Sequence, residues 1–133
     1  MRFMLIQSYG RAAGVDIPIT EWSHDDVVAH IEFQRVLNDE LGALGELIDA
    51  QALSGPEVAS SVTWDGSGVP VVTDGPFPES KELIAGYRIV EVESRVRAVE
   101  IAARISAAPG PGGVPIRQPI EVRQVLDASA ADL

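Results

Sequence analysis

Two helical segments separated by strand-forming runs constrain the fold of this chain more than any other feature of its sequence. The first begins after Ser23, a candidate N-cap with Asp26 three residues later, and ends near Leu44. Its apolar face follows steps of three and four residues, through Val27, His30, Phe33, Leu37, Leu41 and Leu44. The second segment begins after Ser94. Its apolar face follows the same spacing, through Ala98, Ile101, Ala102 and Ile105.

Six runs of apolar and β-branched residues are typical of short strands. They cover residues 2–8, 47–53, 58–64, 69–73, 87–92 and 120–125. The third and fourth runs flank residues 65–68 (DGSG), a sequence typical of a β-hairpin turn. No helical pattern follows the last run. This order predicts an α+β fold, in which a ferredoxin-like antiparallel sheet carries two helices on one face and an inserted hairpin.

The length of 133 residues suits one domain, which we assign to residues 1–126. Residues 127–133 are acidic and are predicted to form a frayed tail. Both helices are expected to cover one face of the sheet, so the other face needs a cover. A second copy of the chain is the simplest one. The topology therefore predicts a homodimer.

The composition excludes several classes of protein. Ten Lys and Arg against 20 Asp and Glu give a net charge of −10, which argues against contact with nucleic acid or anionic lipid. No apolar run approaches the roughly 18 residues of a membrane span, and the apolar start is too short for a signal peptide. The chain has no Cys and two distant His, too few ligands for a zinc site. We therefore expect a cytoplasmic protein without a metal or cofactor.

Residues 73–87, with the sequence TDGPFPESKELIAGY, form the most specific motif of the chain. This segment resembles the DGPF branch of the YCII-related family, whose signature is D-G-P-F-x-E-[ST]-K-E followed by a glycine and an aromatic residue. Residues 120–125 (IEVRQV) resemble the closing E-[VI]-R strand of that branch. Residues 30–34 (HIEFQ) resemble the H-x-x-F found in the first helix of many members. The resemblance covers nearly the whole chain.

The resemblance implies a ferredoxin-like fold that pairs into a dimeric α+β barrel. Members of the family are small soluble bacterial proteins, most without an assigned reaction, in which a His and an Asp are regarded as an active-site pair. At least one relative in the wider family removes chloride from a chlorinated hydroxyquinol. DGPF members are often encoded beside extracytoplasmic-function sigma factors, which implies a regulatory link.

Carried over to this chain, the resemblance assigns the family Asp to Asp74 and the family His to His30. Gln34 is the alternative for the His position, because its distance to Gly45 matches the spacing in the family. His30 and Gln34 are four residues apart, so both lie on the same helix face in either case.

His30 belongs to the apolar face of the first helix and is therefore expected to point toward the sheet. A buried imidazole needs a hydrogen-bond partner, and Asp74 could orient it as a general acid or base. The alternative is a core histidine whose partner is a backbone carbonyl. Asp74 also has an alternative, since an Asp before Gly-Pro commonly accepts backbone N–H bonds within a turn.

Further candidates are polar residues of the motif, the first helix and the strands. Tyr87 and Arg123 could hold a substrate oxygen or carboxylate, although cross-strand pairing would also explain them. Gln34, Lys81 and Glu79 are candidates for substrate binding, and a solvated charged surface is the alternative for the last two.

Two functions are open at this stage. The first is a small cofactor-free enzyme acting on a small molecule, with His30 transferring a proton, Asp74 orienting it, and Arg123 or Tyr87 holding an oxyanion. The alternative is a non-catalytic ligand- or protein-binding module linked to an extracytoplasmic-function sigma factor. The enzyme requires His30 and Asp74 within hydrogen-bond reach, directly or through one water.

Overall fold

The computed structural model describes residues 1–8, 17, 19–75 and 84–126. Its strands and helices follow one another in the predicted order. The strands are β1 (Arg2–Ser8), β2 (Leu47–Ala52), β3 (Ser60–Thr63), β4 (Val71–Asp74), β5 (Ile84–Glu91) and β6 (Ile120–Gln124). The helices are α1 (His24–Ala43) and α2 (Arg95–Ser106), with 3-10 turns η1 (Ile19–Glu21), η2 (Pro56–Val58) and η3 (Pro111–Gly113). The predicted tail at 127–133 lies outside the described residues.

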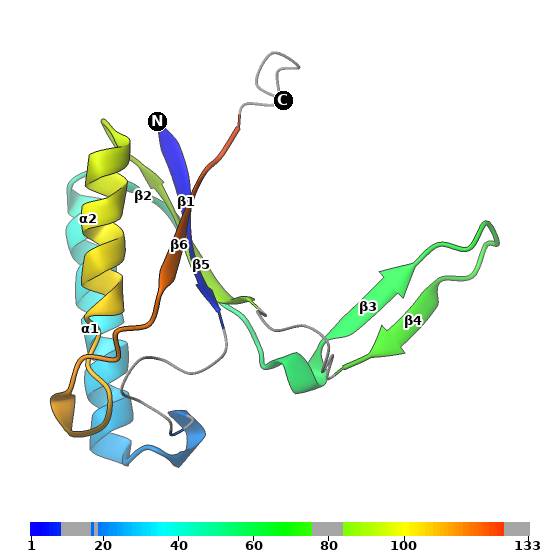
Figure 1. Cartoon of the computed structure of the whole chain (residues 1–133), viewed down its shortest axis with the longest axis horizontal. Coiled ribbons are helices and arrows are strands. Elements are labelled where there is room, and N and C mark those ends of the chain that lie inside the picture. The colour runs from blue at the N-terminus through cyan, green and yellow to red at the C-terminus, as the bar shows by residue number, and fades with distance from the viewer. Residues whose placement is uncertain (9–16, 18, 76–83, 127–133) are drawn as a thin grey trace.

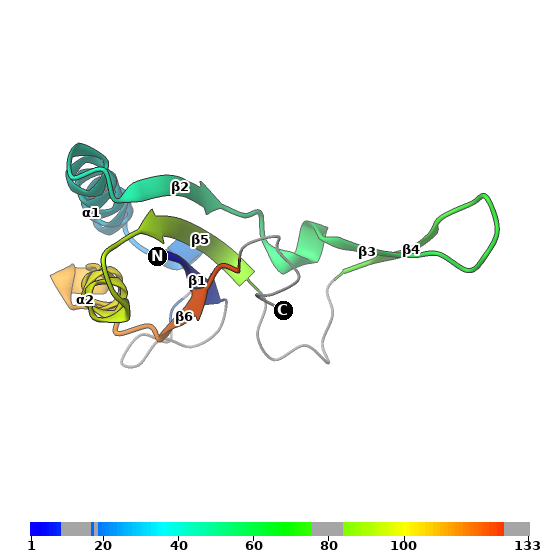
Figure 2. The same cartoon turned by 90° about the horizontal axis from the view of Figure 1, so that it is seen from above.

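Four strands form an antiparallel sheet in the order β2-β5-β1-β6. Both helices cover the same face of this sheet (Figures 1 and 2). This arrangement confirms the predicted ferredoxin-like α+β fold. No helix of the described residues covers the opposite face, and the homodimer that would cover it stays a prediction.

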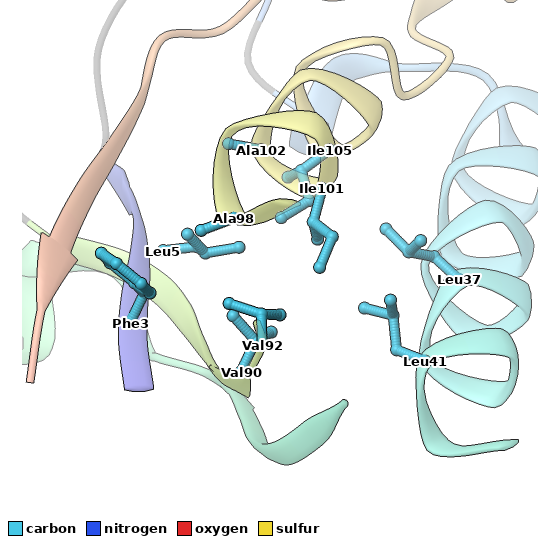
Figure 3. Close-up of a cluster of buried hydrophobic side chains, with 10 residues drawn as sticks. All are labelled: Phe3, Leu5, Leu37, Leu41, Val90, Val92, Ala98, Ile101, Ala102 and Ile105. Atoms are coloured by element: carbon cyan, nitrogen blue, oxygen red, sulfur yellow. The ribbon is translucent and has the colours of Figure 1, made fainter. Parts of the chain in front are cut away.

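Apolar side chains from the sheet and both helices form one core between the two layers (Figure 3). The buried members are Phe3, Leu5, Leu37, Leu41, Val90, Val92, Ala98, Ile101, Ala102 and Ile105. The predicted apolar face of α1 is fully buried at Leu37 and Leu41. It ends before Leu44, which is 64% exposed because it caps the helix beyond its last turn.

Local hydrogen bonds fix the helix ends where the sequence predicts them. The Ser23 hydroxyl accepts from the backbone N–H of Asp26 at 3.2 Å, and the Ser94 hydroxyl accepts from that of Arg97 at 3.4 Å. After α1 the chain turns through Gly45, whose φ of +72° is a conformation that glycine adopts without strain. Both predicted N-caps are therefore confirmed.

The inserted hairpin is a two-stranded ribbon, residues 60–74, that projects away from the sheet and helices (Figure 1). Its loop spans residues 64–70 and is longer than the predicted turn at 65–68. The loop folds on itself, since Ser67 donates its backbone N–H to Asp65 Oδ1 at 2.9 Å and its carbonyl accepts from Trp64 Nε1 at 2.8 Å. Within the loop, these bonds take the place of the inter-strand hydrogen bonds that pair β3 with β4.

Gly86 in β5 permits a close approach of β2. A Cβ at this position would lie 2.8 Å from the carbonyl oxygen of Gln51, which is closer than side-chain carbons come to oxygen. The next two residues, Tyr87 and Arg88, then point to opposite faces of the sheet. No helix within the described ranges is long and apolar enough to cross a membrane.

Candidate functional site

His30 lies in the second turn of α1, half-buried between the helix and the loop that follows α2. Its Nδ1 is 2.9 Å from the carbonyl oxygen of Pro109, and its Nε2 is 3.4 Å from Nε2 of Gln34. The Trp22 ring meets the imidazole edge to face, with centroids 5.4 Å apart. The backbone carbonyl that the sequence offered as an alternative partner is therefore present.

The partners of His30 determine which nitrogen carries the proton. A carbonyl oxygen can only accept, so Nδ1 donates to Pro109 and Nε2 of a neutral imidazole becomes the acceptor. The Gln34 amide then donates to Nε2 and keeps its oxygen free to accept from elsewhere. That oxygen lies 2.6 Å from Nη2 of Arg88, a group that can only donate. The hydrogen bonds thus run in one direction from Arg88 through Gln34 and His30 to Pro109.

Arg88 is the one charged residue buried among the described residues, with 4% of its surface exposed. It lies on the helix-covered face of β5, where its Nε donates to Asn38 Oδ1 at 2.8 Å. No described carboxylate forms an ion pair with it. Burial alone lowers the pKa of Arg88 to about 10. The guanidinium is nevertheless charged at neutral pH.

The sequence places three of these polar side chains together through simple periodicity. His30, Gln34 and Asn38 are four residues apart and share one face of α1. Sequence reasoning identified the first two and missed Asn38, although the same spacing includes it. It also missed Arg88, which lies two residues after Gly86 and therefore shares the buried face of β5 with it.

Asp74 ends β4, on the projecting ribbon, and its side chain is exposed. Its Oδ1 accepts from the Ser60 hydroxyl at 2.7 Å, across the ribbon. Among the described residues, His30 contacts Pro109, Gln34 and Trp22, and Asp74 contacts Ser60. The structure does not bring the two side chains together by a described hydrogen bond, and their pairing stays a prediction.

Tyr87 and Arg123 lie on the face of the sheet without helices. Tyr87 pairs with Ile6 and Arg123 with Met4, so both share a face with the outward residues of β1. Tyr87 donates its hydroxyl to Asp49 Oδ2 at 3.1 Å, a bond that raises the pKa of the phenol. Both residues are separated from His30 by the sheet, and their predicted substrate contacts stay predictions.

Glu79 and Lys81 lie outside the described residues. The described part of the chain contains no group of three or more His, Asp or Glu that could hold a metal ion. A broad surface hollow lies at the other end of the sheet, where Arg97 pairs with Glu46 at 2.8 Å. It contains none of the predicted site residues.

A family model described as YCII-related domain matches residues 1–121. No curated protein matches the chain. The match spans strands β1 to β5, both helices and the whole of the cluster around His30.

Proposed function

The chain belongs to the YCII-related family, and from that premise we propose that it is a small-molecule enzyme in which His30 transfers a proton. The observation that carries this proposal is the directed hydrogen-bond chain around the imidazole. Pro109 occupies Nδ1 at 2.9 Å, whereas Nε2 has only a long contact of 3.4 Å to Gln34. Nε2 is therefore the nitrogen that carries the lone pair, and a substrate would take the place of the long contact from Gln34.

The chemistry follows from this tautomer. Nε2 takes a proton from an acidic C–H or O–H group of the substrate, and the electron pair of that bond stays on the substrate as an enolate or phenolate. The resulting imidazolium is stabilised because its Nδ1–H already donates to the Pro109 carbonyl. The same Nε2–H then returns the proton to another atom of the substrate. Histidine suits both steps because its ordinary pKa lies near neutrality.

Proton transfer can be measured before the natural substrate is identified. We would incubate the protein in deuterated buffer with a panel of small carbon acids, including 1,3-diketones, 2-oxo acids and hydroxyquinols, and follow the loss of C–H signals by NMR. The His30→Gln variant is expected to lower the exchange rate about 100-fold or more for any compound that the wild type processes. His24→Gln is a matched control, since His24 is exposed at the start of α1. Equal rates for the His30 variant and the wild type would contradict the proposal.

A second candidate function, protein binding, is supported by the ribbon of residues 60–74. Its exposed apolar side chains include Val62, Trp64 and Val72, with Trp64 78% exposed. An isolated two-stranded ribbon is marginally stable in water, and clustered exposed apolar residues commonly mark an interface. The predicted partner is a second copy of the chain, since the helix-free face of the sheet also needs a cover. The sigma-factor link stays a prediction from resemblance.

Self-association is tested by light scattering after size exclusion. The wild type is expected to elute with twice the mass of the chain, and Trp64→Ser combined with Val72→Thr to shift it toward the monomer. A matched control is Val96→Thr, an exposed apolar residue of α2 on the helix layer. A monomeric wild type, or a double variant that remains dimeric, would count against the ribbon as the interface.

A further inference from the structure

We propose that Arg88 is the anchor of an anion site between α1 and β5 that binds the carboxylate of a small organic acid. The proposal rests on the proposed role of His30 and assigns a substrate class to that site. Three observations carry it: the lack of a counter-ion for Arg88 among the described residues, an edge of its guanidinium without a described partner, and its connection to His30 through one side chain.

The first observation is a buried charge for which the described residues supply no counter-ion. The chain has twice as many acidic as basic residues, and four arginines of the described part form ion pairs with Asp or Glu, namely Arg2, Arg35, Arg97 and Arg104. All four are more exposed than Arg88, whose described partners are two neutral amides. A buried charge is unfavourable unless an opposite charge or strong hydrogen bonds offset its lost hydration. An anionic ligand would supply the missing charge.

The second observation is an unused donor. Nε donates to Asn38 and Nη2 to Gln34, but Nη1 has no partner among the described residues. Nη1 is not fully enclosed, since every fully enclosed side-chain nitrogen or oxygen of the described residues has a partner. The edge formed by Nη1 and the second N–H of Nη2 has the geometry that binds a carboxylate with two parallel hydrogen bonds.

The third observation is the link to His30. Gln34 accepts from Arg88 Nη2 at 2.6 Å and lies 3.4 Å from His30 Nε2 through its amide nitrogen. A carboxylate on Arg88 would therefore hold the rest of a small molecule beside the basic atom of His30. This arrangement favours an acid with an ionisable C–H or O–H group a few bonds from its carboxylate. It also assigns substrate anchoring to Arg88, on the same face of the sheet as His30.

The test compares binding of a charged probe and its neutral isostere. Sodium benzoate and sodium acetate are added to the protein, with benzamide and acetamide as controls, and the midpoint of thermal unfolding is measured. At least one carboxylate is expected to raise the midpoint, and its amide to leave it unchanged. Arg88→Met is expected to weaken the carboxylate response about tenfold or more. Arg95→Met, at an exposed arginine at the start of α2, is expected to retain it.

A second variant keeps the test independent of any folding defect in Arg88→Met. Gln34→Glu preserves the shape of the side chain and places a permanent carboxylate against Arg88. It is expected to abolish the response to benzoate and acetate in a folded protein. Neither carboxylate stabilising the wild type, or an unchanged response in both Arg88→Met and Gln34→Glu, would overturn the site.

The two proposals fail separately. His30→Gln is expected to retain the carboxylate response, because it leaves the guanidinium in place. Deuterium exchange that depends on His30 without any carboxylate binding would remove the anion site and leave proton transfer standing. Carboxylate binding that depends on Arg88, without exchange in any compound, would confirm the anion site and contradict the enzyme.

Discussion

Gln34 Oε1 accepts a hydrogen bond from Arg88 Nη2 at 2.6 Å, and this contact fixes which way the amide of Gln34 points. With its oxygen directed at a cation, the amide can offer only its N–H groups to His30. The orientation of one neutral side chain thus connects a buried positive charge to the tautomer of an imidazole.

Gln34→Leu is expected to destabilise the protein by about 1–3 kcal/mol, because it leaves a donor of the buried Arg88 without an acceptor. The measurement is urea unfolding followed by circular dichroism. Gln124→Leu is the matched control, since Gln124 is exposed at the end of β6 and its replacement should change the free energy of unfolding by less than about 0.5 kcal/mol. Equal stability of the two variants would show that Arg88 does not depend on Gln34.

The architecture was predictable because it depends on local patterns. Ser23 and Ser94 cap helices through bonds three residues away, and the apolar faces of the helices follow from spacing alone. Long-range partners were less accessible. Pro109 contributes a backbone oxygen, which no side-chain pattern predicts, and it is 79 residues from His30. Arg88 carried a usable signal, which is a charged residue at a buried position of an alternating strand.

The pairing of Glu46 with Arg97 predicts an acid-sensitive contribution to stability. Hydrogen bonding from Arg97 lowers the pKa of the Glu46 carboxyl below its ordinary value of 4.5. A carboxyl with a lowered pKa in the folded state stabilises the fold above its unfolded pKa, and this contribution is lost as pH falls through the folded pKa. Glu46→Gln should therefore lower the free energy of unfolding by about 1 kcal/mol at pH 7, because the pair is only partly exposed to solvent. Near pH 3 the substitution should lower it by much less. Urea unfolding at both pH values measures the difference.

A constant difference between wild type and Glu46→Gln across this pH range would mean that packing, rather than the charge of Glu46, accounts for the effect. Glu57→Gln serves as the control, since Glu57 is exposed in η2 and forms no ion pair among the described residues. Its substitution should leave the unfolding free energy nearly unchanged at either pH.

Tyr87 is expected to ionise at higher pH than an ordinary tyrosine. Its hydroxyl donates to the Asp49 carboxylate, and this bond favours the protonated phenol. A group with a raised folded pKa stabilises the fold below its unfolded pKa and loses that contribution as pH rises through the folded value. Absorbance titration near 295 nm should show a late transition that Tyr87→Phe removes and Asp49→Asn moves to lower pH. No change in the titration with Asp49→Asn would exclude the bond.

Gly86 and Gly42 provide a matched pair in which the same substitution should have opposite effects. A Cβ on Gly86 would meet the Gln51 carbonyl oxygen at 2.8 Å, so Gly86→Ala must displace β2 or β5 and is expected to destabilise the protein by about 1–3 kcal/mol. Gly42 lies in the last turn of α1, with no atom within 4 Å of an added Cβ, so Gly42→Ala is expected to stabilise by about 0.5–1 kcal/mol. Because Arg88 follows two residues after Gly86, the first variant should also weaken carboxylate binding, whereas the second should not. Loss of stability without any loss of carboxylate response would show that the approach of β2 to β5 supports the sheet but does not position Arg88.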